Sequence, residues 1–245
     1  MVEGRRAVVT GASAGIGEAT AKALASSGHR VVVGARRLER LESIAAEIGA
    51  QAFELDVTDE ESVDRFAAAV GPVDVVINNA GLSQGMDHVV ASETGSWQRM
   101  FETNVIGAMR IARAFIPRLI ESGDGHLVQL GSISGFEVYP GGAGYTASKH
   151  AMRAMTKTLR LELLGEAVRV TDICPGMVET EFSTVRFDGD ADRAAQIYSG
   201  LQPLVAEDIA DCILWAVTRP SNVNIDEIVV RPRAQATSTA VHRAG

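Results

Sequence analysis

The sequence places Tyr145 and Lys149 four residues apart, in the segment "GYTASKHA". On a helix this spacing brings both side chains to one face. A phenol has an ordinary pKa near ~10 and is a poor base at neutral pH, but a cation within ~4–6 Å lowers that pKa because it stabilises the phenolate. We therefore expect Lys149 to tune Tyr145 for proton transfer.

Ser132 precedes this pair, and the glycine-rich stretch "PGGAG" lies between them. The glycines let the chain bend back, so that Tyr145 faces the end of the strand that carries Ser132. The Ser132 hydroxyl would then hold a carbonyl or alcohol oxygen beside the phenol, an arrangement suited to proton transfer at a carbinol oxygen. A Tyr–Lys pair on a helix is ordinary by itself, so this interpretation depends on the motifs around it.

Glycines also mark the turn "TGASAGIG" at 10–17, which follows an apolar run and opens a helical segment. They allow a tight turn, and the helix beyond it offers free N–H groups to a pyrophosphate. The spacing is not that of the common dinucleotide fingerprint, and no Lys-Ser/Thr pair follows as in a P-loop. Glycine at such a turn can serve packing alone, but its place at the first strand–helix junction favours nucleotide binding. The predicted contacts are Gly11, Ser13, Gly15, Ile16 and Gly17.

The second predicted strand ends in "GARRLERLE", where Ala35 is followed by Arg36 and Arg37. In dinucleotide-binding folds this position meets the adenosine ribose, and an acidic residue there accepts a hydrogen bond from the 2′-hydroxyl of NAD. Two guanidinium groups instead suit a 2′-phosphate. The alternative is a solvated helix start with ion pairs to Glu39 or Glu42. We predict that the cofactor is NADP.

Apolar runs rich in valine and isoleucine alternate with stretches of helical periodicity along the chain. Continuous apolar strands separated by helices predict a parallel sheet covered on both faces. We therefore predict an α/β protein with one doubly wound Rossmann domain over 1–245, built on a seven-stranded parallel sheet. The predicted strands are 6–10, 30–35, 51–56, 73–78, 126–131, 168–174 and 227–230. The predicted helices are 15–27, 37–48, 59–70, 96–121, 145–165 and 206–218.

Two segments do not follow this alternation. The first, about 176–204, comes after the carboxyl end of a strand, where ligands bind in open α/β sheets. We predict that it forms a substrate loop. The second, about 234–245, is small and polar, and we predict a loosely held terminus there.

The composition argues against several functions. The formal net charge of −8 and the scattered basic residues argue against nucleic-acid binding. No apolar run reaches ~18 residues, so we expect no membrane span, and the N-terminus lacks the apolar core of a signal peptide. The 2 cysteines and 5 histidines lack ligand spacing. We therefore expect no metal, and a cytoplasmic protein with reduced thiols.

The motifs described above occur together with three others, "NNAG" at 78–81, Asn104 within "FETNVIG" and "PG" at 175–176. Each motif is weak alone, but their combination and order are highly specific. With them the chain resembles the short-chain dehydrogenase/reductase family over almost its full length.

The resemblance implies a catalytic tetrad of Asn104, Ser132, Tyr145 and Lys149. Tyr145 would act as acid and base, and Ser132 would orient the substrate oxygen. Lys149 would bind the nicotinamide ribose and lower the pKa of Tyr145, while Asn104 would hold a water that links Lys149 to solvent. Further cofactor contacts would come from Asp56, Val57, Asn79, Val178 and Thr180. Family members usually form homotetramers through the helices around 96–121 and 145–165.

The segments "TEFSTVRF" and "VNI" are similar to those of NADP-dependent 3-hydroxy acid dehydrogenases, which oxidise serine, allo-threonine and related small-molecule substrates. In the first segment we predict that Arg186 anchors a substrate carboxylate. The alternative for Arg186 is an ion pair to Glu181, Asp188 or Asp190. A C-terminal extension from about Thr237 departs from the pattern and would alter access to the site.

Two other functions remain open. One is a ketone or 3-oxoacyl reductase of the same family with a larger substrate. The other is a nucleotide sensor without catalysis. The presence of all four tetrad residues argues against the sensor, because no structural role requires all of them.

Overall fold

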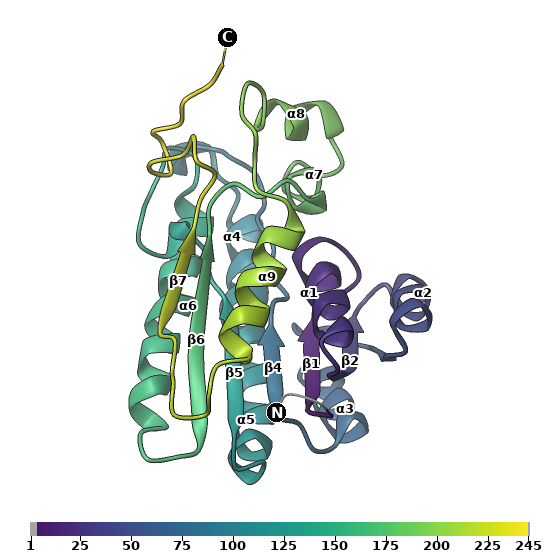
Figure 1. The fold of residues 1–245 in the computed structure, drawn as a ribbon. Coiled ribbons are helices and arrows are strands. Elements are labelled where there is room, and N and C mark those ends of the chain that lie inside the picture. The colour runs from purple at the N-terminus through teal and green to yellow at the C-terminus, as the bar shows by residue number, and fades with distance from the viewer. Residues whose placement is uncertain (1–3, 245) are drawn as a thin grey trace.

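The computed structural model describes residues 4–244, and in them the core is a parallel sheet of seven strands (Figure 1). The strands are β1 (Arg6–Thr10), β2 (Arg30–Ala35), β3 (Gln51–Glu54), β4 (Val75–Asn78), β5 (Gly125–Leu130), β6 (Val168–Pro175) and β7 (Glu227–Val230). Their order in the sheet is β3-β2-β1-β4-β5-β6-β7, which reverses direction between β1 and β4. This is the doubly wound arrangement, so the predicted fold class is confirmed. The predicted domain of 1–245 includes 1–3 and 245, which lie outside the described residues.

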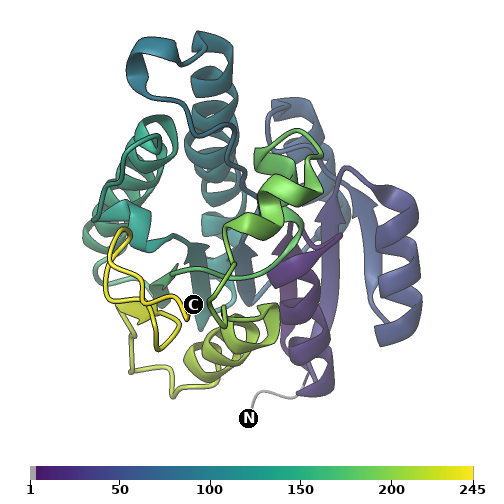
Figure 2. The ribbon, with the colours of Figure 1, turned by 90° about the horizontal axis from the view of Figure 1, so that it is seen from above.

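Helices cover both faces of the sheet (Figures 1 and 2). One face carries α1 (Gly15–Ser26), α2 (Leu38–Ile48) and α9 (Ala206–Val217), and the other carries α3 (Glu60–Val70), α5 (Ala108–Glu121) and α6 (Ala143–Glu162). Successive strand residues pack on opposite faces, as Val8 and Val9 do in separate hydrophobic clusters. The sequences of the strands are therefore nearly continuous apolar runs, because both faces of the sheet are buried.

The third strand is shorter than predicted. It ends at Glu54, where the prediction extended it to Asp56. The reason is a local turn, because Asp56 Oδ1 accepts hydrogen bonds from the backbone N of Thr58 at 2.9 Å and from its hydroxyl at 2.7 Å. Aspartate commonly turns the backbone in this way.

The predicted helix 96–121 is continuous but not uniform. α4 (Thr94–Phe101) runs into a π-helical segment, Glu102–Gly107, before α5 begins. Asn104 lies in this segment and is buried. Such insertions are frequent at functional sites because they redirect a side chain.

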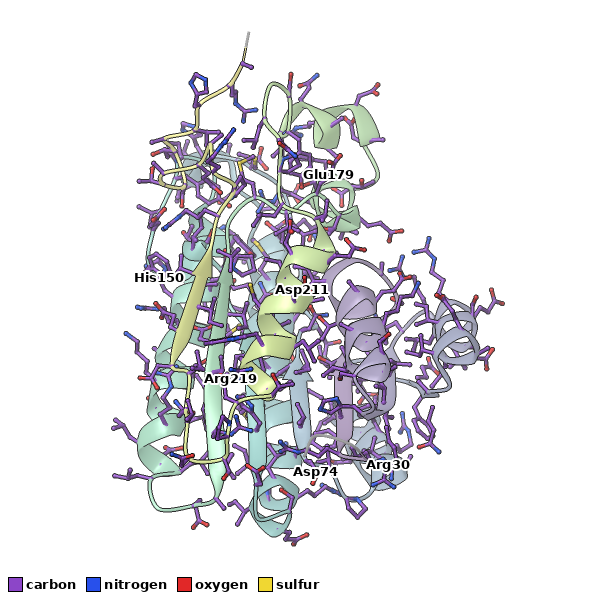
Figure 3. All side chains as sticks on the ribbon, in the orientation of Figure 1. Arg30, Asp74, His150, Glu179, Asp211 and Arg219 are labelled. Atoms are coloured by element: carbon purple, nitrogen blue, oxygen red, sulfur yellow. The ribbon has the colours of Figure 1, made fainter. Side chains whose placement is uncertain are left out.

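The carboxyl ends of the strands carry the long connections, at the top of Figure 1. β6 leads into 176–204, which contains α7 (Glu181–Arg186) and α8 (Ala191–Gln196), and β7 leads into the C-terminal tail. Figure 2 shows both segments over this end of the sheet. In Figure 3, Glu179 lies at this end, whereas Arg30 and Asp74 lie at the opposite end. None of the helices in residues 4–244 is long and apolar enough to cross a membrane.

The tail after residue 234 differs from the loose terminus we expected. Gln235 is buried, and its Oε1 accepts a hydrogen bond from the backbone N of Met177 at 2.9 Å. Ser238 donates to Glu137 Oε2 from its backbone N at 2.6 Å and from its hydroxyl at 2.8 Å. The small polar residues of this tail therefore make hydrogen bonds to the body of the protein, which their composition alone did not indicate.

Candidate active site

A cavity of about 520 Å³ opens at the carboxyl ends of the strands. The glycine loop, the ends of β4, β5 and β6, the segment 176–204 and the C-terminal tail all line it. Of the predicted site residues, it is lined by Gly11, Gly15, Ile16, Gly17, Arg37, Asn79, Ser132, Tyr145, Lys149, Val178, Thr180 and Arg186. The fold thus brings together predicted residues from most of the chain length.

Tyr145 lies near the start of α6 and is 9% exposed. Its phenol lines the same cavity as Ser132, which follows the end of β5. Burial raises the pKa of Tyr145 above its ordinary value, and the Arg186 charge and the Ser132 hydrogen bond oppose that rise. Ser132 and Tyr145 thus lie at one cavity, the predicted hydrogen bond to a substrate oxygen stays a prediction, and the buried phenol depends on a cation to ionise near neutral pH.

Lys149 lies one turn further along α6 and is 5% exposed. Its Nζ donates a hydrogen bond to the carbonyl of Leu130 at 2.7 Å and lies 5.9 Å from the centre of the Tyr145 ring. Burial lowers the pKa of Lys149 to about 8, and the charge of Asp172 opposes this fall. Because the ammonium turns toward Leu130, the cation closer to the Tyr145 ring is Arg186, whose Cζ lies 5.3 Å from the ring centre.

Asn104 uses its side chain to hold a neighbouring loop. Its Oδ1 accepts from the backbone N of Leu82 at 2.8 Å, and its Nδ2 donates to the Leu82 carbonyl at 2.8 Å and to Ser148 Oγ at 3.0 Å. A Cβ on Gly81 would lie 3.2 Å from Asn104 Oδ1 and 3.8 Å from Lys149 Nζ. Asn104 and Lys149 therefore flank the same glycine, and the predicted water between Lys149 and solvent stays a prediction.

The glycine loop has the conformation that a dinucleotide site requires. Gly11 and Gly15 have φ values of +65° and +59°, which disfavour other residues. A Cβ on Gly17 would lie 2.5 Å from the Gly11 carbonyl, so the turn also needs glycine for close backbone approach. No side chain caps the start of α1 at Ala14, and this end of the helix lines the cavity. Its N–H groups therefore fit a pyrophosphate.

The two arginines after β2 have different environments. Arg37 lines the cavity, its Nε donates to Ser13 Oγ at 3.1 Å, and its Nη1 pairs with Glu181 at 2.8 Å. Arg40 pairs with the same carboxylate at 2.8 Å. Arg36 is exposed and does not line the cavity. The ion-pair partner of Arg37 is thus on α7, whereas the alternative considered from the sequence was a neighbour on its own helix.

Other predicted cofactor contacts have structural partners as well. The Asn79 Nδ2 donates to the carbonyl of Thr10 at 2.8 Å, which ties β4 to the glycine loop. Asp56 and Val57 lie outside the lining of the cavity. Thr180 caps α7, where its hydroxyl accepts from the backbone N of Phe182 at 3.3 Å. The adenine contact assigned to Asp56 and Val57 stays a prediction.

Arg186 projects into the site from the end of α7. Its Nε donates to Ser83 Oγ at 2.8 Å and its Nη2 to Tyr139 Oη at 3.2 Å. Both partners are neutral, and in the described part of the chain none of the acids considered from the sequence pairs with it. Glu181 binds Arg37, Asp188 accepts from Gln84, and Asp190 accepts from the backbone N of Arg193. The guanidinium therefore keeps an uncompensated charge beside Tyr145.

Sequence reasoning missed several residues of this site. Tyr139 and Ser83 hold Arg186, and Glu181 binds the arginine nearest the glycine loop. Tyr139 directly precedes the "PGG" bend, which was a signal of its position. Ser83 and Glu181 carried no such signal, because their partners are distant in the sequence.

Comparison with known proteins supports these observations. The family model described as short chain dehydrogenase matches residues 5–191. The chain belongs to the short-chain dehydrogenase family. This confirms the resemblance inferred from the motifs.

Relatives within the family match along almost the whole chain. An uncharacterized oxidoreductase of Mycobacterium tuberculosis is 54% identical over 96% of this chain and 94% of its own. An NADP-dependent 3-hydroxy acid dehydrogenase of Schizosaccharomyces pombe is 37% identical over 99% of this chain and 98% of its own. A solved structure of the closed form of serine dehydrogenase complexed with NADP+ has a TM-score of 0.93, with 36% identity over 98% of this chain and 100% of its own.

The length of chain that these relatives match corrects one expectation. The residues from about Thr237 were interpreted as an extension beyond the family pattern, but a relative that matches 99% of this chain shares nearly all of them. The tail is therefore not an extension beyond the sequence of that relative. Its small polar residues gave no apolar periodicity by which to recognise it.

Proposed function

We propose that this protein is an NADP-dependent oxidoreductase that transfers hydride between the nicotinamide and the carbinol or carbonyl carbon of a small 3-hydroxy acid, such as serine or allo-threonine. The observation that carries the substrate class is the Arg186 guanidinium, which lies 5.3 Å from the centre of the Tyr145 ring. Its partners Ser83 and Tyr139 are neutral, so its charge is available to an anionic substrate.

The cofactor assignment rests on two features of the cavity. The uncapped start of α1 fits the pyrophosphate, and Arg37 with Ser13 fits the 2′-phosphate that distinguishes NADP from NAD. Relatives and a structural neighbour that are named with NADP support the same choice. When bound, NADP supplies the group that accepts or donates the hydride.

The distance between Arg186 and Tyr145 suits a short substrate. A carboxylate bound to the Arg186 guanidinium and a hydroxyl bound to the Tyr145 phenol would be separated by only a few atoms, because Arg186 Cζ lies 5.3 Å from the centre of the Tyr145 ring. A 3-hydroxy acid has its carbinol carbon two bonds from its carboxyl carbon. Guanidinium geometry also matches the two oxygens of a carboxylate.

The protein groups then divide the proton transfer. Ser132 holds the substrate oxygen, and the Tyr145 phenolate accepts its proton during oxidation. Positive charge from Arg186 stabilises that phenolate, and Lys149 binds the nicotinamide ribose. In reduction, the phenol returns the proton to the carbonyl oxygen.

The experiment follows absorbance of the reduced cofactor across 3-hydroxy acids, neutral secondary alcohols and ketones, with NADP and NAD in parallel. We expect the highest kcat/KM with a short 3-hydroxy acid and NADP. Equal kcat/KM for the acid and a neutral alcohol of the same length would contradict the substrate class. Turnover with NAD alone would contradict the cofactor.

A second candidate is a ketone or 3-oxoacyl reductase with a larger substrate. The apolar side chains of Met86, Phe182, Val185 and Ile197 line the cavity and favour it. The same panel separates the two functions, because a larger apolar ketone would then exceed every 3-hydroxy acid in kcat/KM.

We also propose a cytoplasmic homotetramer that assembles through α4–α5 and α6. Leu161 and Leu164, at the end of α6 and just beyond it, are 76% and 86% exposed, and they place neighbouring apolar side chains on the surface where we propose the interface. Sedimentation equilibrium measures the assembly, and a monomer at micromolar concentration would contradict it.

A further inference from the structure

A row of polar side chains lies on the face of the sheet that α6 covers. Gln129 of β5 pairs with Asp172 of β6, and Asp172 pairs with Glu227 of β7, so the three side chains share one face of the sheet. That face is the one covered by α6, because Arg153 of α6 binds Glu227 at 2.8 Å. Gln129 and Asp172 are 0% and 2% exposed.

Asp172 is a buried acid that the rest of the molecule leaves incompletely paired. Its Oδ1 has no hydrogen-bond partner among the described residues. The Cys174 sulfur and a Glu227 carboxylate oxygen lie within 4.8 Å of its carboxylate. A buried carboxylate is costly unless a cation or several donors compensate it. Its compensation must therefore come mainly from a nearby positive charge.

Lys149 is the cation whose charge acts most on Asp172. A Cβ on Gly131 would collide with Asp172 Oδ1, so the carboxylate lies against the backbone at the end of β5. The next residue back, Leu130, is the one whose carbonyl accepts the hydrogen bond of the Lys149 ammonium. The other partner of Lys149 is the sulfur of Met152 at 3.6 Å. Both of its hydrogen-bond partners are neutral.

We propose that Asp172 is a positioning residue for catalysis: its carboxylate holds the buried Lys149 ammonium in its charged form. This inference rests on the proposed function only for the role of Lys149 at the cofactor. Neutral Lys149 would lose one donor and its charge, and both serve the contact proposed with the nicotinamide ribose. Asp172 is not among the residues that line the cavity, so it would act through Lys149.

The other charged groups around Lys149 do not take this role. Glu227 is neutralised by Arg153 and is partly exposed. Burial raises the pKa of the Cys174 thiol, so the thiol stays neutral. Tyr145 on the same helix is neutral in its resting form, and Arg186 of α7 is a cation that would only disfavour the ammonium. The Asp172 charge raises the pKa of Lys149, and although burial raises the pKa of Asp172 itself, the Lys149 charge opposes that rise.

The direction of the pH effect on cofactor binding follows from the change in the Lys149 pKa. Burial lowers the pKa of Lys149 to about 8 although Asp172 opposes it. Without the Asp172 charge the pKa falls further, so Lys149 becomes neutral at a lower pH. Cofactor binding that depends on the ammonium should weaken as pH rises through the Lys149 pKa, and this weakening should begin earlier in a variant without Asp172.

The test measures the dissociation constant of NADPH against pH, from cofactor fluorescence, in wild type, Asp172→Asn and Asp226→Asn. The control removes an equal charge from an exposed carboxylate beside Arg160. We expect wild-type binding to weaken above pH about 8, with the midpoint at a lower pH in Asp172→Asn and unchanged in Asp226→Asn. If the Asn variant does not fold, Asp172→Ser, which leaves room for a water, is measured in the same way.

A second measurement gives the pKa of Lys149 in the protein without any ligand. The rate at which acetic anhydride acetylates Lys149, which lines the cavity, rises with the neutral amine, and mass spectrometry of its peptide gives the pKa. A lower Lys149 pKa in Asp172→Asn supports the inference. An unchanged or higher pKa overturns it, whether or not NADPH binds. Wild-type protein that fails to bind NADPH, with a Lys149 pKa that still depends on Asp172, would overturn the cofactor assignment instead.

Discussion

At the scale of single residues, the cation that acts most on the Tyr145 phenol is not the one that the spacing of Tyr145 and Lys149 predicted. The sequence spacing pointed to Lys149, but Arg186 lies closer to the Tyr145 ring, at 5.3 Å from its centre against 5.9 Å. Arg186 comes from a segment 41 residues further along the chain, where no local periodicity reveals its target. Two predictions follow from its position, one for substrate binding and one for pH.

Replacing Arg186 by leucine should remove the anchor for an acidic substrate. A hydrogen bond to a charged group contributes ~1.5–3 kcal/mol, and ~1.4 kcal/mol is tenfold in affinity, so KM should rise roughly ten- to a hundredfold for a 3-hydroxy acid. KM for a neutral alcohol should change little. Arg193→Leu in the same segment, whose guanidinium lies over Phe187, is the matched control. An equal rise in KM for both substrates would rule out the anchor.

The same variant should shift the pH dependence of oxidation. Burial already raises the pKa of Tyr145, and the Arg186 charge opposes that rise. Without this charge the pKa of Tyr145 is higher, so the phenolate forms at a higher pH. The acid limb of kcat/KM for a neutral alcohol, which needs the phenolate, should therefore move to higher pH. Arg186→Lys, which keeps a charge, should shift it less. A limb that stays in place would show that Arg186 does not act on the phenol.

At the scale of elements, the end of β2 and the start of α7 share one carboxylate. Glu181 of α7 binds both Arg37 and Arg40, and these hydrogen bonds are the largest cause that lowers the pKa of Glu181. The ion pairs are about half exposed, so they contribute little to stability. These ion pairs matter because they hold Arg37 in place, and Arg37 also contacts Ser13 in the glycine loop.

Arg37→Ala should reduce the preference for NADP over NAD, whereas Arg36→Ala should change it less. Arg37 faces the cavity and Arg36 does not. The loss of one charged hydrogen bond predicts a roughly ten- to hundredfold fall in kcat/KM with NADP and little change with NAD, since NAD lacks the phosphate. Steady-state rates with both cofactors measure this. A larger effect of Arg36→Ala would transfer the phosphate contact to Arg36.

At the scale of the whole molecule, the C-terminal tail closes part of the cavity. Glu137, just past the strand end that carries Ser132, binds the tail through Ser238 and Arg231. Burial pushes the pKa of Glu137 up, but the Ser238 hydrogen bonds and the Arg231 charge more than offset it, and the pKa lies below its ordinary value. The ionised carboxylate therefore fastens the tail at neutral pH.

Glu137→Ala should release the tail while the sheet stays folded. Trypsin should then cut faster at Arg233 and Arg243, and KM should rise because Gln235 and Ser238 line the cavity. Circular dichroism should show an unchanged helix content. Glu166→Ala, at an exposed turn after α6, is the control. Cleavage at the wild-type rate would mean that the other tail contacts hold it without Glu137.

The sequence by itself predicted a parallel sheet, the order of helices and strands along the chain, and Ser132, Tyr145 and Lys149 as residues of one site. Buried parallel strands require continuous apolar runs, the turn before α1 requires glycine, and an i, i+4 pair shares a helix face whatever surrounds it. Only the tertiary structure decided which groups surround that pair. Three contacts join segments far apart in the chain: Arg186 over the Tyr145 ring, the two arginines that share Glu181, and the tail against the cavity. Such contacts arise from packing of whole elements, and they leave no periodic signal in any one stretch of sequence.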